Sequence, residues 1–282
     1  MRAKINQSSI KMKKAKVLYI MQEITPYLDE TPMSHIGRYL PQGVQEKSRE
    51  IRTFMPRYGN INERRNQLHE VIRLSGMNLI IDDNDHPLII KVASIQQARM
   101  QVYFIDNEDY FHRKSVFTDK SGKFFEDNDE RVIFFARGVL ETVKKLGWPP
   151  DVIHCHGWFT SLAPLYIKKS FKDNPLFSDA KVVLSLYDDD FNESLSDDFT
   201  KKLKFGKIKE ADLKNYKLNN YEGLIKGAID HADAFVMASE NINPELEKYA
   251  RAQNKPILEF HGKDDYINAY NEFYDQLIEE EQ

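Results

Sequence analysis

The chain has 282 residues, of which 41% are hydrophobic and 30% are charged, and its formal net charge is −4. This length fits one large domain with a tail, and the apolar fraction is enough for an ordinary globular core. Lys and Arg are scattered among Asp and Glu, so no field of one sign would attract a polyanion, and we expect no nucleic-acid partner. The lone Cys155 cannot form an internal disulfide, which favours a cytoplasmic location.

The two ends of the chain differ from its middle. Residues 1–15 form a polar, basic leader without the apolar segment of a signal peptide, and no later apolar run approaches the roughly 18 residues of a spanning helix. We therefore expect neither export by that route nor a membrane partner. The main domain is predicted over residues 16–254, and residues 255–282 are predicted to add a strand and a helix that close the same domain.

The first half of the chain predicts several strands followed by a long helix. Residues 16–22 form an apolar run of strand length, and Pro26 separates it from a helix expected over about residues 33–48. Residues 127–145 place apolar side chains three and four positions apart, which predicts a long helix with one buried face, ended by Gly147. Further strands, with a hairpin in the middle of the chain, are expected at residues 51–55, 77–81, 88–93 and 102–105.

The second half alternates between the two periodicities. Strands are expected at residues 151–156, 182–186, 234–239 and 257–260, and helices at residues 161–169, 221–231, 244–252 and 264–279. Such alternation predicts parallel strands joined by right-handed crossovers, and hence a Rossmann-like α/β fold with a mainly parallel sheet and helices on both faces. Residues 188–217 interrupt the pattern with few apolar anchors, which favours a mobile loop or a small insertion.

One strand end concentrates residues that could carry chemistry. The segment PDVIHCHGW, residues 150–158, directs His154 and His156 to the same side of a strand and places Trp158 just beyond it. Ligands of open parallel sheets bind at this end, so one interpretation has His156 and Trp158 partly open to a crevice. The other has the histidines satisfying buried polar groups while Trp158 fills the core. A His-x-His pair can bind metal, but no third clustered ligand accompanies it, and no metal site is expected.

Three common motifs are missing from the sequence. No Gly-x-Gly-x-x-Gly follows the first strand, no Gly-Lys-Ser/Thr phosphate loop occurs, and there is no nucleophile elbow around a serine. Ordinary dinucleotide, P-loop and serine-hydrolase chemistry therefore lack their main support, and no cofactor is expected.

Several segments, taken in chain order, nevertheless resemble the N-terminal domain of bacterial glycogen and starch synthases. That family consists of retaining glucosyltransferases of GT-B fold that use ADP- or UDP-glucose. The resemblance implies that this chain forms a single half of a GT-B fold, with His156 assisting at the sugar if it is active. The matching segments are Glu23 to Pro26 with the Glu-x-x-Pro loop, MPRYG at 55–59 with the Pro-x-Tyr loop, VYFID at 102–106, the Asp127-Asn128 helix start, residues 150–158 with PDVVHAHDWH, and KGAI at 226–229 with Ala232-Asp233.

The chain departs from the family pattern at its donor-binding positions. Where the family has Lys-Thr-Gly-Gly, this sequence has Asp29, Glu30, Thr31 and Pro32. Two carboxylates replace a cation and proline removes a backbone donor, so this loop would repel a sugar-nucleotide diphosphate. The Asp of the family's His-Asp-Trp signature is Gly157, and the His-Asn after the next strand corresponds to Tyr187-Asp188. The printed residues also end before the region in which the family's donor domain would lie.

Two main hypotheses follow from the match and its departures. In the first, the domain is a noncatalytic pseudoenzyme that binds an α-glucan or a protein partner of glycogen metabolism, with substrate contacts from Trp158, Tyr58, Tyr187, Glu23 and His154. In the second, it is a glucosyltransferase subunit whose donor domain is supplied by another polypeptide. An unrelated activity on the same fold is the third alternative.

Overall fold

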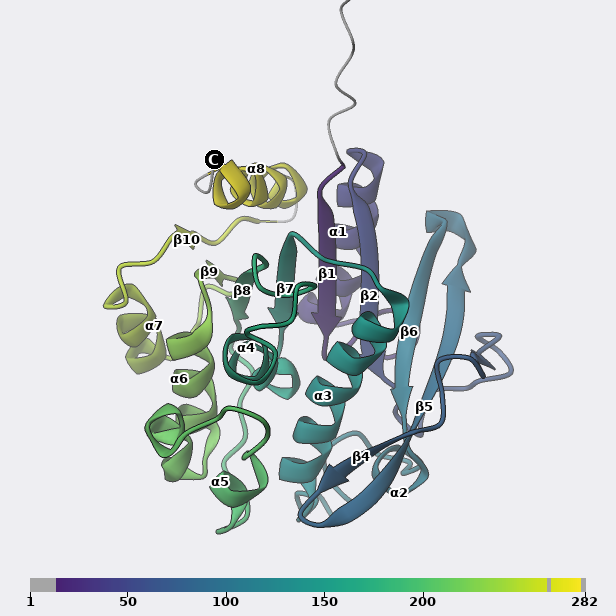
Figure 1. The fold of residues 1–282 in the computed structure, drawn as a ribbon. Coiled ribbons are helices and arrows are strands. Elements are labelled where there is room, and N and C mark those ends of the chain that lie inside the picture. Colours follow the sequence, from purple (N-terminus) through teal and green to yellow (C-terminus); the bar gives the residue numbers. More distant parts are fainter. Residues whose placement is uncertain (1–13, 263–264, 280–282) are drawn as a thin grey trace, which may run out of the picture.

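A 10-stranded sheet forms the centre of the protein in the computed structural model, which describes residues 14–262 and 265–279 (Figure 1). Its strand order is β10-β9-β8-β7-β1-β2-β6-β5-β3, and β4 pairs with β5 off this path. The strands are β1 (Lys16–Met21), β2 (Glu50–Pro56), β3 (His69–Glu70), β4 (Met77–Ile81), β5 (Asn84–Ile95), β6 (Met100–Asp106), β7 (Val152–His156), β8 (Lys181–Leu186), β9 (Ala234–Met237) and β10 (Ile257–Leu258). The α-helices are α1 (Pro32–Glu46), α2 (Glu108–Phe111), α3 (Asn128–Leu146), α4 (Ala163–Leu165), α5 (Phe199–Lys202), α6 (Tyr221–His231), α7 (Pro244–Arg251) and α8 (Tyr266–Glu279).

The mainly parallel sheet predicted from the alternating pattern is confirmed. Every neighbouring pair from β10 to β6 is parallel. The pairs β5–β6, β4–β5 and β3–β5 are antiparallel, which confirms the hairpin expected in the middle of the chain. The predicted helix over residues 161–169 is shorter as an α-helix, because α4 passes into a π-helical turn, Tyr166–Ser170. Of the predicted leader, residues 1–13 lie outside the described part of the chain.

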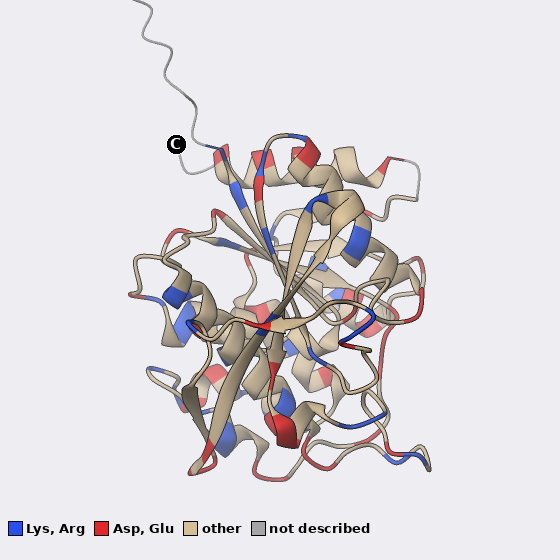
Figure 2. Cartoon of the chain, turned by 90° about the vertical axis from the view of Figure 1, so that its right-hand side faces the viewer, with Lys and Arg blue, Asp and Glu red and all other residues tan. Residues whose placement is uncertain are grey.

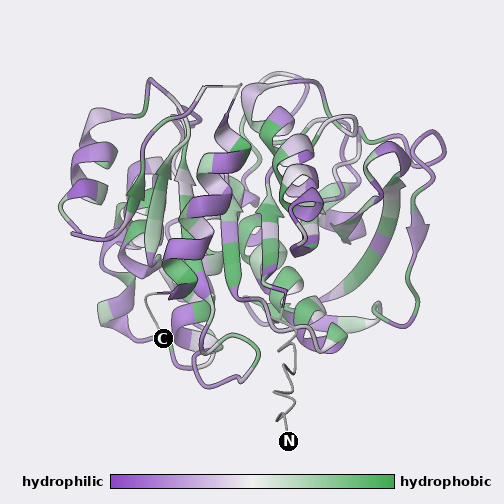
Figure 3. Ribbon diagram, turned by 90° about the horizontal axis from the view of Figure 1, so that it is seen from above, coloured by the Kyte–Doolittle hydropathy of each residue, from purple (hydrophilic) through white to green (hydrophobic). Residues whose placement is uncertain are grey.

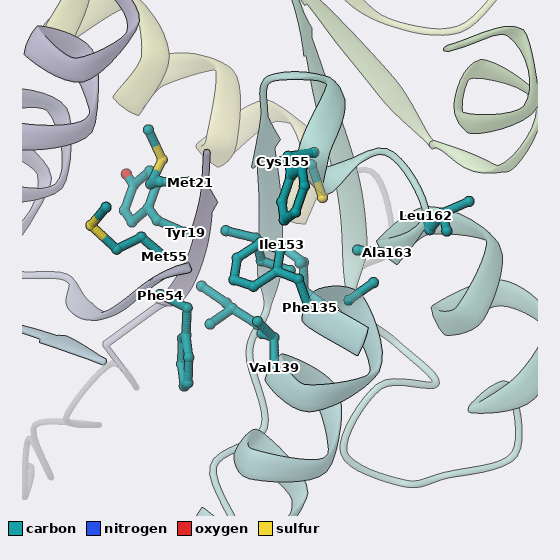
Figure 4. Packing of buried hydrophobic residues seen from close by; sticks show 14 of the residues in the cluster. Tyr19, Met21, Phe54, Met55, Phe135, Val139, Ile153, Cys155, Leu162 and Ala163 are labelled. Carbon is teal, nitrogen blue, oxygen red and sulfur yellow. The ribbon is translucent and has the colours of Figure 1, made fainter. Parts of the chain in front are cut away.

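Helices cover both faces of the sheet, as the apolar strand sequences require. All of β1 from Val17 to Met21 is buried, so both of its faces must be packed. On one face, α1 comes so close that a Cβ on Gly37 would lie 3.0 Å from the Met21 side chain. On the other, Phe135 of α3 lies beside Ile153 of β7 (Figure 4). Viewed from above, the hydrophobic strands lie between helices whose outer sides are hydrophilic (Figure 3).

The start of α1 is fixed by local capping chemistry. Thr31 is the N-cap, its Oγ1 accepts a hydrogen bond from Ser34 N at 3.0 Å, and Ser34 Oγ accepts one from Thr31 N at 2.8 Å. Pro32 occupies the first helical position, where no backbone donor is needed. A reciprocal cap of this kind satisfies two donors that a helix end leaves unpaired. The same four residues that depart from the family's loop therefore serve to begin this helix.

Residues 188–217 form folded structure, which fits the small insertion and not the mobile loop, and they have more apolar anchors than the sequence suggested. Leu195, Phe199, Leu203, Leu213 and Tyr216 are buried, and the segment contains α5 and two short 3-10 turns. The ring of Tyr216 packs against α6 at a glycine, because a Cβ on Gly227 would lie 2.3 Å from it. These anchors are four, four, ten and three positions apart, with mostly polar residues between them. Only Leu195, Phe199 and Leu203 keep a helical spacing, and so short a run did not mark the segment as regular structure.

The C-terminal helix α8 returns to the sheet after β10, the last strand (Figure 1). Tyr266, Tyr270, Phe273, Tyr274 and Leu277 are its buried residues. The helix contacts α1 where Gly43 leaves room for Ile267, since a Cβ on that glycine would lie 2.6 Å from the isoleucine side chain. It is also tied to the loop before β2, because Arg49 donates hydrogen bonds to Asn271 Oδ1 at 2.7 Å and to Asp275 Oδ1 at 2.5 Å. The strand and helix of the tail thus pack onto the main domain.

A buried hydrogen bond between α8 and β7 gives the first prediction. Tyr274 Oη and His154 Nδ1 are 2.6 Å apart, and both side chains are fully buried. We expect Tyr274→Phe to lower the free energy of unfolding by about 1–3 kcal/mol, because it leaves the imidazole nitrogen unsatisfied without creating a large cavity. Urea titration followed by circular dichroism measures the change. Tyr39→Phe is the control, since Tyr39 is 42% exposed and should shift stability by less than about 0.5 kcal/mol. Equal effects of both variants would contradict a structural role for this bond.

Candidate functional site

The carboxyl ends of β1, β7 and β8 meet at one edge of the sheet, and the predicted site residues follow these ends. Gln22, the residue after β1, donates its backbone N–H to the carbonyl of His156 at 3.0 Å. Its side-chain Oε1 accepts from Phe159 N, also at 3.0 Å. Gln22 therefore joins the ends of β1 and β7. Gln22 belongs to no motif in the sequence, and its place directly before Glu23 is the one local signal that points to it.

The two histidines of β7 lie against each other in the interior. Their ring centroids are 3.9 Å apart, and both side chains are fully buried. His154 is hydrogen bonded on both nitrogens, to Tyr274 and to Ser185 Oγ at 2.8 Å. Burial lowers the pKa of His154 well below its ordinary value and lowers the pKa of His156 to about 3. Both imidazoles are therefore neutral at physiological pH.

His156 differs from His154 in having one unsatisfied nitrogen. Its Nδ1 lies 2.8 Å from Tyr187 Oη, whereas its Nε2 is buried and has no hydrogen-bond partner among the described residues. A buried polar atom without a partner is uncommon and calls for an explanation. If the tyrosine hydroxyl donates to Nδ1, the proton of the neutral ring is on Nε2, which is then a free donor.

The expectation that His156 and Trp158 are partly open to a crevice is wrong for this structure. His156 is 0% and Trp158 3% exposed. Of the other proposed substrate contacts, Tyr58, Tyr187 and His154 are buried as well and present no ring face to solvent, whereas Glu23 is half-buried. The sequence predicted that His156 and Trp158 lie at a strand end, but the side chains that bury Trp158 come from other segments of the chain. Ring contacts to Trp158 are made by Phe117, Phe124 and Phe191, at centroid distances of 4.7, 6.0 and 4.8 Å.

Asp189 fixes the turn that carries Trp158. Its Oδ2 accepts a hydrogen bond from Trp158 N at 2.9 Å, and its Oδ1 accepts one from Tyr221 Oη at 3.3 Å. Burial raises the pKa of Asp189 to about 6, against the lowering effect of the Trp158 amide. Asp188, Asp189 and Asp190 follow β8 in the sequence, and only the structure shows that Asp189 is the one that turns inward.

Glu23 lies beside residues 29–32 at the start of α1, where the sequence departs from the family's donor-binding loop. The Thr31 hydroxyl donates to Glu23 Oε1, and burial raises the pKa of Glu23 despite that bond. Asp29 and Glu30 are exposed just before the helix. Carboxylates are favourable near the positive end of a helix dipole, so they occupy the electrostatic position that a bound phosphate would otherwise take.

Gly157 stands where the family signature has an aspartate, and the backbone conformation at this position favours glycine. Its φ of 87° and ψ of 156° lie in a region essentially restricted to glycine. A Cβ there would lie 2.7 Å from Cβ and Oε1 of Gln22. The turn after β7 is therefore built around glycine and around the Gln22 contact, so an aspartate at this position would not fit the present backbone.

Other features of the described chain limit the chemistry. No group of three or more His, Cys, Asp or Glu among the described residues could hold a metal ion. Within residues 14–262 and 265–279, no helix is both long and apolar enough to cross a membrane. A hollow of about 220 Å³ near the same edge is lined mostly by apolar groups from α1, the end of β9 and α8, including Ile36, Met237, Phe260 and Tyr266.

These observations define an α/β domain of the kind that forms half of a GT-B glycosyltransferase. The fold is similar to the catalytic domain of starch synthase IV from Arabidopsis thaliana bound to ADP and acarbose, with a TM-score of 0.71 and 17% identity, covering 90% of this chain and 53% of that one. A family model described as "Starch synthase catalytic domain" matches residues 16–256. The chain belongs to the starch synthase catalytic domain family.

Curated relatives carry the name glycogen synthase. The protein from Chlorobaculum tepidum is 33% identical over 267 residues, covering 93% of this chain and 52% of that protein. The protein from Chlorobium limicola is 42% identical over 173 residues, covering 61% of this chain and 35% of that protein. The chain thus spans about half the length, or less, of the relatives it matches. The resemblance noted in the sequence is confirmed.

The geometry at Gly157 gives the second prediction. We expect Gly157→Ala to destabilise the protein by about 1–3 kcal/mol more than Gly122→Ala does. Both glycines have positive φ, 87° and 86°, but a Cβ on Gly122 would meet nothing within 4 Å. The comparison therefore offsets the cost of positive φ, and the remaining difference reports the clash with Gln22 together with the extended ψ of Gly157. Thermal unfolding of the two variants measures the difference, and equal losses would show that the turn relaxes freely.

The neutral buried histidine gives the third prediction, a change in the pH dependence of stability. Because the folded-state pKa of His156 is lowered to about 3, only the unfolded chain takes up its proton as the pH falls below about 6.5. This uptake lowers stability by up to about 1.4 kcal/mol per pH unit. His156→Asn should therefore flatten the decline between pH 6.5 and 5. Urea unfolding across this range measures the slope, and the exposed His69→Asn is the control that should leave it unchanged. An unaltered slope in His156→Asn would contradict the neutral assignment.

Proposed function

We propose that this chain is the acceptor-side half of an α-glucan glucosyltransferase of the glycogen synthase type. It would act with a donor domain supplied by another polypeptide and transfer glucose from ADP- or UDP-glucose to an α-1,4-glucan. In this reaction the bond between the glucosyl carbon and the diphosphate breaks and the nucleoside diphosphate leaves with the electron pair. The acceptor hydroxyl oxygen bonds to that carbon and loses its proton. Membership of the family and the names of the relatives support this proposal.

The observation that carries the proposal is the unpaired Nε2 of His156. A neutral imidazole with one nitrogen fixed by Tyr187 and the other left without a partner can donate one directed hydrogen bond to a sugar hydroxyl. Such a donor is strongest in a site from which water is excluded, because the local dielectric is low. A core histidine without such a role would be expected to have both nitrogens satisfied, as in His154.

Substrate access in this proposal requires the aromatic cover over His156 and Trp158 to open. Phe191 of the segment after β8 stacks on Phe124, with centroids 5.0 Å apart, and both rings contact Trp158. Asp189 holds the same segment to the Trp158 amide. Movement of residues around Phe191 would uncover the indole, and a glucose unit stacked on it would replace the lost ring contacts.

The noncatalytic hypothesis is supported by different features. The exposed carboxylates of Asp29 and Glu30 oppose a donor diphosphate at the start of α1, and Gly157 has no side chain to hold the sugar. These departures from the family sequence weaken the contacts that this domain can make to a donor sugar nucleotide. They do not affect an acceptor glucan, which is uncharged, and the relatives' names favour the glucosyltransferase proposal.

A glucose-transfer assay with a matched fusion gives the fourth prediction. We expect residues 1–282 alone to transfer no radiolabelled glucose from ADP-glucose to glycogen, because they span about half of the relative's length and place Asp29 and Glu30 where they oppose a donor diphosphate. A fusion to the remaining half of the Chlorobaculum tepidum glycogen synthase should restore transfer. His156→Ala in that fusion should then lower kcat by roughly 10²–10³, the usual cost of removing one hydrogen-bond donor from a transition state.

Controls separate the outcomes of this assay. His69 lies on the exposed strand β3, so His69→Ala should leave glucose transfer unchanged. Transfer by the unfused chain would overturn the need for a second polypeptide. An inactive fusion that still binds glycogen in cosedimentation would overturn the glucosyltransferase proposal in favour of the noncatalytic one.

A further inference from the structure

A second concave region lies at the opposite, amino-terminal edge of the sheet. It encloses about 530 Å³ beside the starts of β1, β2 and β6, and parts of α1 and the β5–β6 turn complete its wall. Since β1 has six residues, roughly 17–20 Å of strand separates this edge from the edge with His156. The lining residues are Lys14, Gln45, Arg49, Glu50, Ile51, Arg52, Arg99, Gln101 and Tyr103.

Four cationic side chains converge on this hollow, although the whole chain has a net charge of −4. Arg49 is engaged by α8 through Asp275. Lys14, Arg52 and Arg99 form no ion pair with any carboxylate in the part of the chain that the structure describes. The one carboxylate in the wall, Glu50, accepts a hydrogen bond from Trp148 Nε1 at 2.5 Å. Lys and Arg positions appear as blue segments at the upper ends of the strands in Figure 2.

The fold holds the two unpaired arginines in place without neutralising them. Arg52 donates from Nη1 to Tyr103 Oη at 2.8 Å, and its guanidinium lies 5.6 Å from the Trp148 ring and 5.7 Å from the Tyr103 ring. Its Nε is buried and has no hydrogen-bond partner in the described chain. Arg99 occupies the left-handed region with φ of 50°, and Gln45 Nε2 donates to its carbonyl at 3.4 Å. Aromatic packing therefore positions the Arg52 guanidinium, and the Gln45 contact holds the backbone of Arg99 beside the same hollow.

We propose that this hollow is a binding site for a small phosphate ester. Guanidinium groups present planar arrays of donors that match phosphate oxygens, and here two of them lack a counter-ion. A dianionic phosphate would balance the excess cations, which a single carboxylate would do only in part. The volume exceeds that of a free phosphate and is in the range of small-molecule sites, so the amide of Gln101 and the amide oxygen of Gln45 are left for hydroxyl groups of the ester.

The charge distribution argues for a small ligand over a polymer. Among the residues that the structure describes, Lys and Arg outside the hollow are mixed with Asp and Glu, which favours a small ligand over a nucleic acid. The site is also separate from the edge at which the proposed glucose transfer takes place. It therefore does not depend on that proposal.

Isothermal titration of the full chain tests the site and gives the fifth prediction. The probes are inorganic phosphate, ribose 5-phosphate and, as the uncharged comparison, ribose. We expect saturable binding of both phosphates, tighter for the ester, with no binding of ribose. Arg52→Gln and Arg99→Gln should each weaken phosphate binding by about tenfold or more, because each removes a charge-assisted contact. Raising the ionic strength should weaken it further.

Matched substitutions decide between a specific site and general surface charge. Arg64→Gln and Arg73→Gln remove exposed arginines outside the hollow and should leave phosphate affinity unchanged. Circular dichroism melting curves check that Arg52→Gln remains folded, and Arg99→Gln, at an exposed position, provides the same test without a risk to the core. Absence of binding by the unmodified chain, or equal weakening by all four variants, would overturn the proposal. Loss of glucose transfer in a fusion with normal phosphate binding would bear only on the proposed function.

Discussion

The arrangement of this domain depends on burying two neutral imidazoles inside a parallel sheet. His154 and His156 face the same side of β7, and a buried imidazole must find hydrogen-bond partners or lose stability. Ser185 on the neighbouring strand and Tyr274 on α8 supply them for His154. The last helix therefore has to return across the sheet after β10. Gly43, which leaves room for Ile267, and Arg49, which binds Asp275, adapt the α1 region to receive it.

The same burial determines the chemistry that the site can offer. Desolvation keeps both histidines unprotonated, whereas Asp189, with its pKa raised to about 6, is mostly ionised at neutral pH, so the strand-end cluster carries no positive charge. A cluster without a cation is suited to hydrogen bonding with uncharged sugar hydroxyls and poorly suited to neutralising a diphosphate. The acidic residues before α1 add to that difference. In a two-part enzyme, the domain would thus recognise the glucan while another domain holds the donor.

Charge is distributed unevenly between the two edges of the sheet. The carboxyl edge carries Asp29, Glu30 and Asp189, whereas the amino edge carries the unpaired Arg52 and Arg99. A net charge of −4 and an even mixture along the chain hide this separation. It arises because parallel strands bring all their starts to one edge and all their ends to the other, so residues distant in sequence add to one local field.

The sequence by itself determined the fold class, the order of strands and helices, the family and the position of His156 at a strand end. Each of these follows from local periodicity or from short motifs, which the chain carries without reference to its other parts. The exposure of Trp158 and Tyr58, the packing of residues 188–217 and the conformation of Gly157 were decided only by tertiary structure. Phe117, Phe124 and Phe191 come from separate segments to cover Trp158, and Gln22 from another strand occupies the space beside Gly157. Burial depends on which distant segments meet, and no local pattern encodes that.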